Sequence, residues 1–197
     1  MTIPSIYFSM AAFALASSIT PGPVNIVALS SGARHGLAAS LRHVGGATVG
    51  FTLLLLLTGL GLYEVMVRWP QSIAAIRWAG IAFLLYLAWK LAVDDGRLSF
   101  DAGTGPSWLS GAAMQWLNPK AWLASVAGMG AYVANGDAVL VWRFAAIYFV
   151  VCYLSIACWA YAGAALRGYL SDAARIRLFN RAMALLLIAS ALWLLAN

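Results

Sequence analysis

The chain has 197 residues, of which 63% are hydrophobic and only 9% are charged. A soluble domain has about 45–50% apolar and about 25% charged residues, so this composition excludes an ordinary soluble protein and predicts an all-α integral membrane protein. The net charge of +6 does not indicate a nucleic-acid partner, because arginine and lysine also anchor the cytoplasmic loops of membrane proteins beside anionic lipid.

The first apolar segment covers residues 1–33 and carries no charge. The stretch Ala-Leu-Ala-Ser-Ser at 14–18 is similar to a signal-peptidase site, but no basic residue precedes it as a signal peptide requires. We therefore expect this segment to stay in the protein as a membrane helix. Pro21-Gly22-Pro23 interrupts it, and a proline inside a helix costs about 3 kcal/mol because it loses a hydrogen bond and clashes with the preceding turn.

Five further apolar segments follow, and a segment of about 20 residues is long enough to cross a bilayer. They are residues 44–63, 72–93, 102–136, 144–166 and 177–196. The sequence therefore predicts six transmembrane helices in a single membrane domain, 1–197, that lies in a lipid bilayer.

Basic residues are distributed unevenly between the two sets of loops, which predicts the orientation of the chain. Loops 1–2, 3–4 and 5–6 carry eight of them: Arg34, Arg42, Lys90, Arg97, Arg167, Arg175, Arg177 and Arg181. The opposite side, which includes both termini, carries three: Arg68, Arg77 and Arg143. We expect the first side to be cytoplasmic and both termini to face outward.

The polar stretch at 94–106 divides the chain into two halves, 1–93 and 107–197, with three apolar segments each. An odd number per half makes the second half enter the membrane in the opposite sense, which is typical of three-plus-three inverted repeats. Each half begins with a proline-broken segment, because the fourth segment contains Asn118-Pro119-Lys120. Paired breaks of this kind are the best sequence indication of a transporter's binding site.

The residues around the two breaks are the predicted substrate-binding and gating residues. A broken helix exposes backbone groups that must face protein or a water-filled cavity, and the amides that begin the next helix suit a carboxylate. Lys120 lies 13 residues beyond Ser107, or about 20 Å along a helix, which is too deep for an easy return to the cytoplasmic interface. The complete set is Thr20, Pro21, Gly22, Pro23, Asn25, Gln115, Asn118, Pro119 and Lys120.

Structural roles are the alternatives to these functional interpretations. A proline can simply kink a membrane helix, Lys120 can extend to the outer interface, and Asn25 or Asn118 can cap a broken end. Other residues inside the segments have two interpretations as well. Trp116, Trp122 and Trp159 either line a pocket or pack against other helices. Gly46 and Gly50 allow close helix packing, either within the chain or at a homodimer interface.

Acidic residues are confined to segment ends and loops: Glu64, Asp94, Asp95, Asp101, Asp137 and Asp172. Proton-coupled carriers often use a buried carboxylate, so the coupling mechanism is not evident from the sequence. Asp94 and Asp95 are the nearest candidates, with a solvated loop charge as the alternative for each.

Three stretches carry a resemblance to a known family: TPGPVNIVALSSGARHGLAASLRHVGGATVG at 20–50, WAGIAFLLYLAWKLA at 78–92 and QWLNPKAWL at 115–123. They resemble the LysE/RhtB family of bacterial amino-acid exporters, and most of all its cysteine and O-acetylserine branch. The resemblance implies export of an amino acid or a small derivative across the bacterial inner membrane to the periplasm. It also implies that the proton motive force drives this export. From the broken helices we expect hinges for alternating access, and we expect no cofactor and no enzymatic activity.

One departure from the family pattern concerns the substrate. Many members carry a polar residue such as aspartate at the position of Val24. An apolar residue there, together with the lack of carboxylates inside the segments, favours a neutral amino acid. The polar residues at the breaks suit a small polar substrate: Ser17, Ser18, Thr20, Asn25 and Asn118.

Other classes of function are weaker. A metal-ion exporter on the same scaffold lacks buried carboxylates or thiolates, and no metal-ligand motif is present. An intramembrane enzyme would use Ser30, Ser31, His35 or His43, but these have no nucleophile motif. A thiol–disulfide carrier needs cysteines beside the breaks. Cys152 and Cys158 instead lie in one segment, about 240° apart on a helix, where we expect two small buried apolar side chains.

Overall fold

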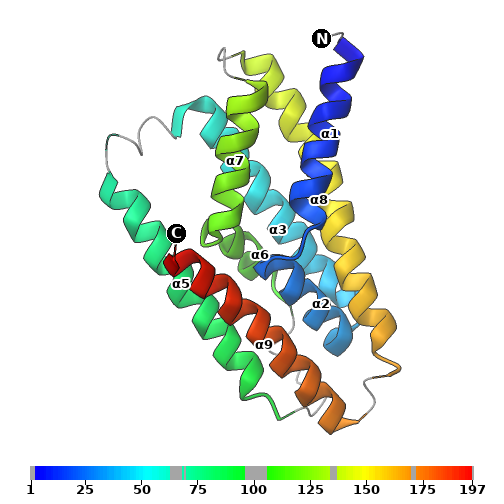
Figure 1. Cartoon of the computed structure of the whole chain (residues 1–197). Helices are drawn as coiled ribbons and strands as arrows, with labels where there is room; N and C mark the ends of the chain where they lie inside the picture. The colour runs from blue at the N-terminus through cyan, green and yellow to red at the C-terminus, as the bar shows by residue number, and fades with distance from the viewer. Residues whose placement is uncertain are drawn as a thin grey trace.

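In the computed structural model, residues 3–62, 68, 70–95, 106–133, 137–169 and 172–196 are described. All regular structure in these ranges is helical, which agrees with the predicted all-α class. The helices form an elongated bundle (Figure 1). Several residues named above lie outside the described part: Glu64, Arg97, Asp101, the side chain of Arg77 and most of the polar stretch, 96–105.

Within its described residues, the first half of the chain contains α1 (Ile3–Ile19), α2 (Pro23–His35), α3 (Leu37–Leu57), the π-helical turn η1 (Thr58–Leu62) and α5 (Pro70–Ala92). The axes of α1 and α2 differ by 62° at the predicted break. A second sharp turn joins α2 to α3 at Gly36, whose φ of 79° is a conformation that favours glycine.

The second half has α6 (Trp108–Trp116), α7 (Pro119–Tyr132), α8 (Ala138–Leu166) and α9 (Ala173–Ala196). Several helices are longer than the apolar segments that predicted them. α3 begins at Leu37 rather than 44, and α8 begins at Ala138 rather than 144. The reason is that a basic residue marks the edge of each apolar segment in the sequence, whereas the helices continue through it, at Arg42 in α3 and at Arg143 in α8.

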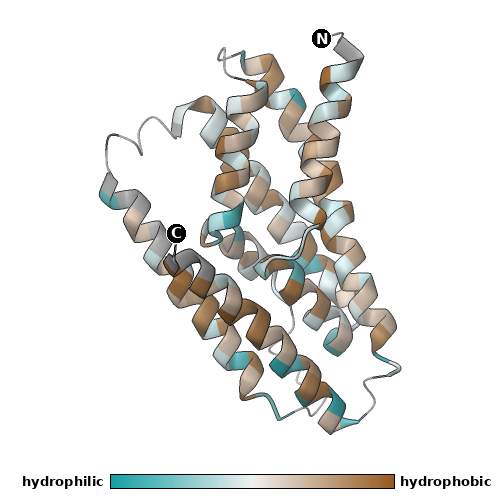
Figure 2. Cartoon of the chain, in the orientation of Figure 1, coloured by the Kyte–Doolittle hydropathy of each residue, from teal (hydrophilic) through white to brown (hydrophobic). Residues whose placement is uncertain are grey.

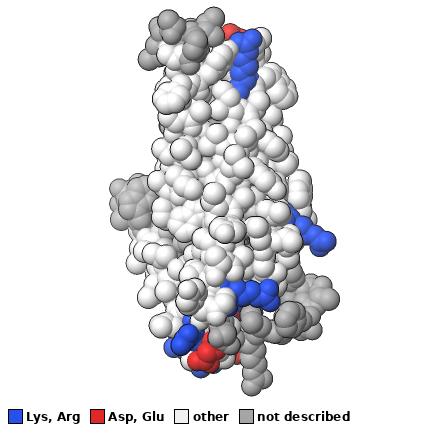
Figure 3. Space-filling model, turned by 90° about the vertical axis from the view of Figure 1, so that its right-hand side faces the viewer, with Lys and Arg blue, Asp and Glu red and all other residues white. Residues whose placement is uncertain are grey.

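The surface and the helix lengths are those of a membrane protein. In the described part of the chain, α3 with the start of η1 and α8 are long and apolar enough to cross a membrane, and the bent pair α1–α2 qualifies as a third span. On the face in Figure 3, most charged side chains lie toward the two ends of the molecule, basic side chains also lie on the flank below mid-height, and the broad surface above them is uncharged. Such an uncharged belt suits the hydrocarbon core of a bilayer.

The buried side chains form two separate clusters. The larger cluster joins α1, α2, α3, α6, α7 and α8, and aromatic residues such as Phe51, Phe144 and Tyr148 lie in it. The smaller cluster lies between α5 and α9, with Ile26 of α2 as its link to the rest. α5 and α9 are therefore a helix pair with a core of its own, and they run side by side in Figure 1.

Glycines allow the helices of the larger cluster to cross at very short range. A Cβ atom on Gly163 of α8 would lie 1.9 Å from the carbonyl oxygen of Leu29, and one on Gly32 of α2 would lie 2.0 Å from that of Ala160. Gly46 approaches the backbone of Trp108 in the same way, and Gly50 approaches Ala112. The Gly46–Gly50 spacing therefore serves packing within the chain, between α3 and α6.

The α2–α8 crossing makes a prediction about stability. Gly163→Ala should lower Tm by about 2–12 °C, because overpacking costs about 1–3 kcal/mol and each kcal/mol corresponds to about 2–4 °C in a chain of this size. Gly130→Ala is the matched control, since nothing lies within 4 Å of that position on α7. Thermal unfolding of the purified protein in detergent measures both. Equal Tm values for the two variants would contradict the crossing.

Candidate functional site

The chain breaks at both predicted places, and the helix after each break starts in the same way. α2 and α7 each have a proline at the first helical position, Pro23 and Pro119. A proline there loses no helical hydrogen bond, because the N–H at that position has no partner within the helix. Gly22 precedes α2 in an extended conformation, and Asn118 caps α7 by accepting a hydrogen bond from the Lys120 backbone N–H at 3.2 Å.

The helices before the breaks, α1 and α6, end in carbonyl groups that need donors. Trp159 Nε1 donates to the Ile19 carbonyl at 3.0 Å, and Trp122 Nε1 donates to the Trp116 carbonyl at 2.8 Å. Asn25 Nδ2 donates to the Ser18 carbonyl at 2.8 Å. In an apolar bundle an unpaired carbonyl is costly, so these side chains are what allow the helices to end there.

Lys120 joins the two breaks. Its Nζ donates to the Thr20 carbonyl and to Thr20 Oγ1, both at 2.8 Å, and lies 3.4 Å from the Pro21 carbonyl. Gly22 makes room for this side chain, since a Cβ there would lie 3.3 Å from Lys120 Nζ. Lys120 therefore reaches across to the first break. Figure 2 shows hydrophilic residues within the bundle at the start of α7.

A cavity of about 30 Å³ lies beside Lys120. Of the predicted site residues, Asn25, Gln115, Asn118 and Lys120 line it. Thr20, Pro21 and Gly22 form the turn between α1 and α2, and Pro23 and Pro119 begin α2 and α7. The remaining lining residues are Ser17, Ser18, Val24, Phe51, Ala121, Ala124, Tyr148, Cys152 and Ile156.

Some of these lining residues were missed or misread at the level of the sequence. The apolar patterns of α3 and α8 do not distinguish Phe51, Tyr148 or Ile156 from packing residues, because helix rotation is not visible in a uniformly apolar segment. Cys152 is buried and lines the cavity. The expectation that both cysteines are buried is wrong for Cys158, which is exposed on the other side of α8.

The tryptophans inside the segments were expected to line a pocket or to pack. None of Trp116, Trp122 and Trp159 is among the described lining residues. The indole rings of Trp116 and Trp122 meet edge to face at 6.0 Å. Trp122 and Trp159 serve as donors to the broken ends, a role that the sequence did not indicate.

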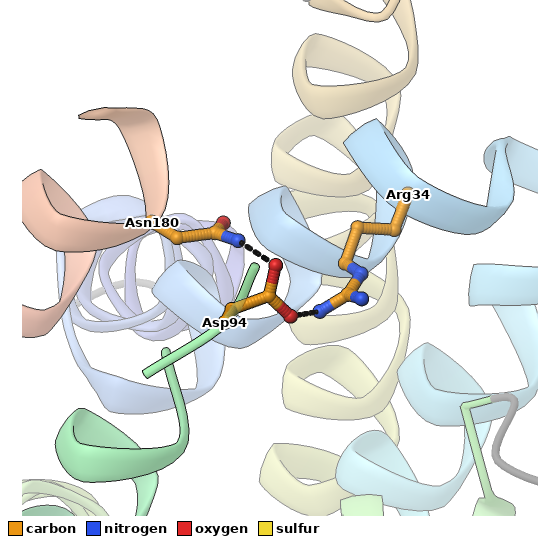
Figure 4. Close-up of polar contacts among 3 residues, drawn as sticks. All are labelled: Arg34, Asp94 and Asn180. Carbon is orange, nitrogen blue, oxygen red and sulfur yellow. Dashed lines mark hydrogen bonds and ion pairs between the residues drawn. The ribbon is translucent and has the colours of Figure 1, made fainter. Parts of the chain in front are cut away.

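An ion pair lies near one end of the bundle, away from the cavity. The Arg34 guanidinium at the end of α2 donates to Asp94 Oδ2, and Asn180 Nδ2 of α9 donates to Asp94 Oδ1 at 3.1 Å (Figure 4). The Asp94 side chain is only 11% exposed, so it is not a solvated loop charge. This network ties α2 to the α5–α9 pair.

Together these features define a membrane transporter: an apolar helix bundle with two broken helices and a small polar cavity between them. Residues 15–197 match the family described as "LysE type translocator", and the chain belongs to this family. It is 29% identical over 162 residues to the "Cysteine/O-acetylserine efflux protein" of Escherichia coli (strain K12), with 81% of this chain and 83% of that protein covered. The protein of the same name from Shigella flexneri serotype 5b is 30% identical over 153 residues, with coverages of 77% and 78%.

The family identifies the chain as a translocator, and the two relatives are named as efflux proteins for cysteine and O-acetylserine. No solved structure matches the chain significantly. In the described ranges, no three His, Cys, Asp or Glu side chains gather as a metal site would require.

Asn118 has a capping role that can be separated experimentally from any role in substrate binding. Asn118→Ala should destabilise the protein by about 0.5–2 kcal/mol because α7 loses its cap, whereas Asn118→Ser keeps an acceptor and should retain most of the stability. Thermal unfolding in detergent compares the two variants with the parent. The capping role would be refuted if alanine and serine lowered Tm equally.

Proposed function

We propose that the protein exports small neutral amino acids from the cytoplasm to the periplasm across the bacterial inner membrane. The observation that carries this proposal is the position of the Lys120 ammonium, which bridges the two breaks at the edge of the cavity. A carboxylate is a stronger acceptor for an ammonium than a backbone carbonyl is, so an incoming amino acid can replace Thr20 and Pro21 as its partner. The names of the relatives support the same substrate class.

The cavity supports a substrate without net charge. None of the described lining residues is acidic, and Lys120 is the basic one among them. A zwitterion would present its carboxylate to Lys120 and its ammonium to neutral oxygen acceptors such as those of Asn25 and Gln115. Val24, which is only 3% exposed, also lines this cavity, so the apolar departure from the family pattern bears directly on the substrate.

We further propose six membrane passes arranged as a three-plus-three inverted repeat. Exchange of the two halves maps α1 onto α6, α2 onto α7, α3 onto α8 and α5 onto α9. The observed helix contacts follow this exchange: α1–α8 has its counterpart in α3–α6, α2–α9 has its counterpart in α5–α7, and α3–α8 and α5–α9 map onto themselves. This pattern supports a pseudo-two-fold relation between the halves.

The small size of the cavity supports transport by alternating access. A volume of about 30 Å³ has room for about two water molecules, so an amino acid enters only if the walls move apart. The α5–α9 pair has its own small core, and Arg34–Asp94 is an ion pair between this unit and α2. We propose that the ion pair holds the cytoplasmic end closed, with both termini on the outer side.

The proposed energy source is the proton motive force. Uptake of labelled O-acetylserine into inside-out vesicles should rise when the vesicle interior is made acidic relative to the medium. It should fall when an ionophore dissipates this pH gradient. Uptake that is unaffected by the ionophore would rule out proton coupling while leaving the exporter role in place.

Lys120 provides the most specific prediction about transport. Lys120→Gln should weaken the apparent affinity for the amino acid about 10–100-fold, because a hydrogen bond to a charged group contributes about 1.5–3 kcal/mol. Lys90→Gln, on the exposed face of α5, is the matched control and should transport normally. Labelled O-acetylserine uptake is measured at equal membrane abundance. Normal affinity in Lys120→Gln would refute the site.

The ion pair at the cytoplasmic end can be tested with the cavity's own thiol. In a Cys158→Ser background, Asp94→Asn or Arg34→Gln should speed the alkylation of Cys152 by an impermeant maleimide in inside-out vesicles. An increase of about fivefold is expected from the loss of about 1 kcal/mol of ion-pair energy. Arg181→Gln, an exposed residue of α9, serves as control. Unchanged labelling in both variants would contradict the closure role.

A further inference from the structure

Ser18 is a buried polar group that the helix does not satisfy. Ser18 is 8% exposed and lines the cavity, and its hydroxyl has no partner at full hydrogen-bond geometry, while the Tyr148 phenol and the Cys152 thiol lie beside it. Hydroxyls in apolar helices normally bond to the carbonyl one turn earlier, as Thr48 does to Val44 and Thr58 does to Leu54. Because Ser18 does not, its hydroxyl is available to a molecule that enters the cavity.

Two further polar groups lie close to Ser18 on the wall formed by α8. Tyr148 and Cys152 are one turn apart, so they share a face of the helix, and both are 2% exposed. The Tyr148 ring stacks on Phe51 at 4.4 Å and meets Phe144 edge to face at 5.7 Å. These contacts hold the ring in place, so the position of the phenol is well defined.

We propose that Ser18, Tyr148 and Cys152 form the subsite for the side chain of the transported amino acid. This inference rests on the proposed function and adds the chemistry that selects the substrate. The carboxylate binds at Lys120, and the side chain points toward the hydroxyl, phenol and thiol of the subsite.

The subsite selects short, uncharged side chains that end in a polar group, such as a hydroxyl, thiol or ester. An aliphatic side chain would offer no hydrogen bond to the Ser18 hydroxyl, and sites built to hydrogen-bond a substrate discriminate strongly against analogues that lack the bonding group. A cationic side chain would add a second positive charge beside Lys120, and the described lining offers no acidic partner for it.

The test compares two amino acids that differ by one hydroxyl, serine and alanine, as competitors of labelled O-acetylserine uptake in reconstituted vesicles. The parent should prefer serine. Ser18→Ala and Tyr148→Phe should each reduce the serine-to-alanine preference about tenfold while inhibition by alanine is retained. Ser155→Ala is the matched control, since this α8 serine is also 2% exposed with an unpartnered hydroxyl but does not line the cavity.

The outcomes separate this inference from the proposed function. If the parent exports O-acetylserine and both variants keep the parent's serine-to-alanine preference, the subsite is wrong and the exporter role stands. If the parent transports no amino acid, the exporter role fails and the subsite fails with it. An equal loss of the serine-to-alanine preference in Ser155→Ala and Ser18→Ala would also overturn the subsite. It would indicate that removing any buried hydroxyl of the bundle changes the preference through packing.

Discussion

Backbone groups at a helix end must find partners even when the end lies inside an apolar bundle. Two helices of this protein end and restart in mid-bundle, and the loose carbonyls at Ile19, Trp116 and Ser18 each receive a donor from a side chain. The carbonyls of Thr20 and Pro21 receive theirs from the Lys120 ammonium, which comes from the other break. The polar chemistry of the site therefore follows from how the two breaks satisfy each other.

This arrangement links binding to movement. The cavity is smaller than an amino acid, and the ammonium beside it is already bonded to backbone carbonyls. In the proposed transport cycle, a substrate carboxylate would take over this ammonium, release the contact between the breaks and thereby loosen the two broken helices relative to one another. The α5–α9 pair, with its separate core and its ion pair to Arg34, is the unit whose displacement would open one end.

The sequence predicted the features that depend on residue type and spacing. The proline positions in the two halves predicted where both helices break. The depth of Lys120 in its apolar segment predicted that it lies at the site. The sequence could not predict features that depend on helix rotation or on contacts between distant segments. Tyr148 and Cys152 face the cavity because of how α8 is rotated, and nothing in a uniformly apolar helix records that rotation.

The same limit explains the residues that were interpreted differently from the sequence. Trp159 donates a hydrogen bond to the Ile19 carbonyl because α1 ends close to it in space, although the two residues are 140 positions apart along the chain. Asp94 at the end of α5 looked like a loop charge because its partners, Arg34 and Asn180, come from other helices. Helix ends were displaced where a charged residue interrupts an apolar segment without ending the helix, as Arg143 does in α8.

The central claim is that a positive charge at position 120, held between the two breaks, binds the substrate carboxylate. Chemical restoration of that charge tests it directly. Lys120→Cys should take up little O-acetylserine at a concentration that half-saturates the parent, and treatment with an aminoethyl methanethiosulfonate, which attaches an ammonium to the cysteine, should restore uptake. A neutral methyl methanethiosulfonate should not restore it, and the parent treated with both reagents controls for Cys152. Equal uptake after the neutral and the cationic reagent, or full uptake by untreated Lys120→Cys, would contradict the account.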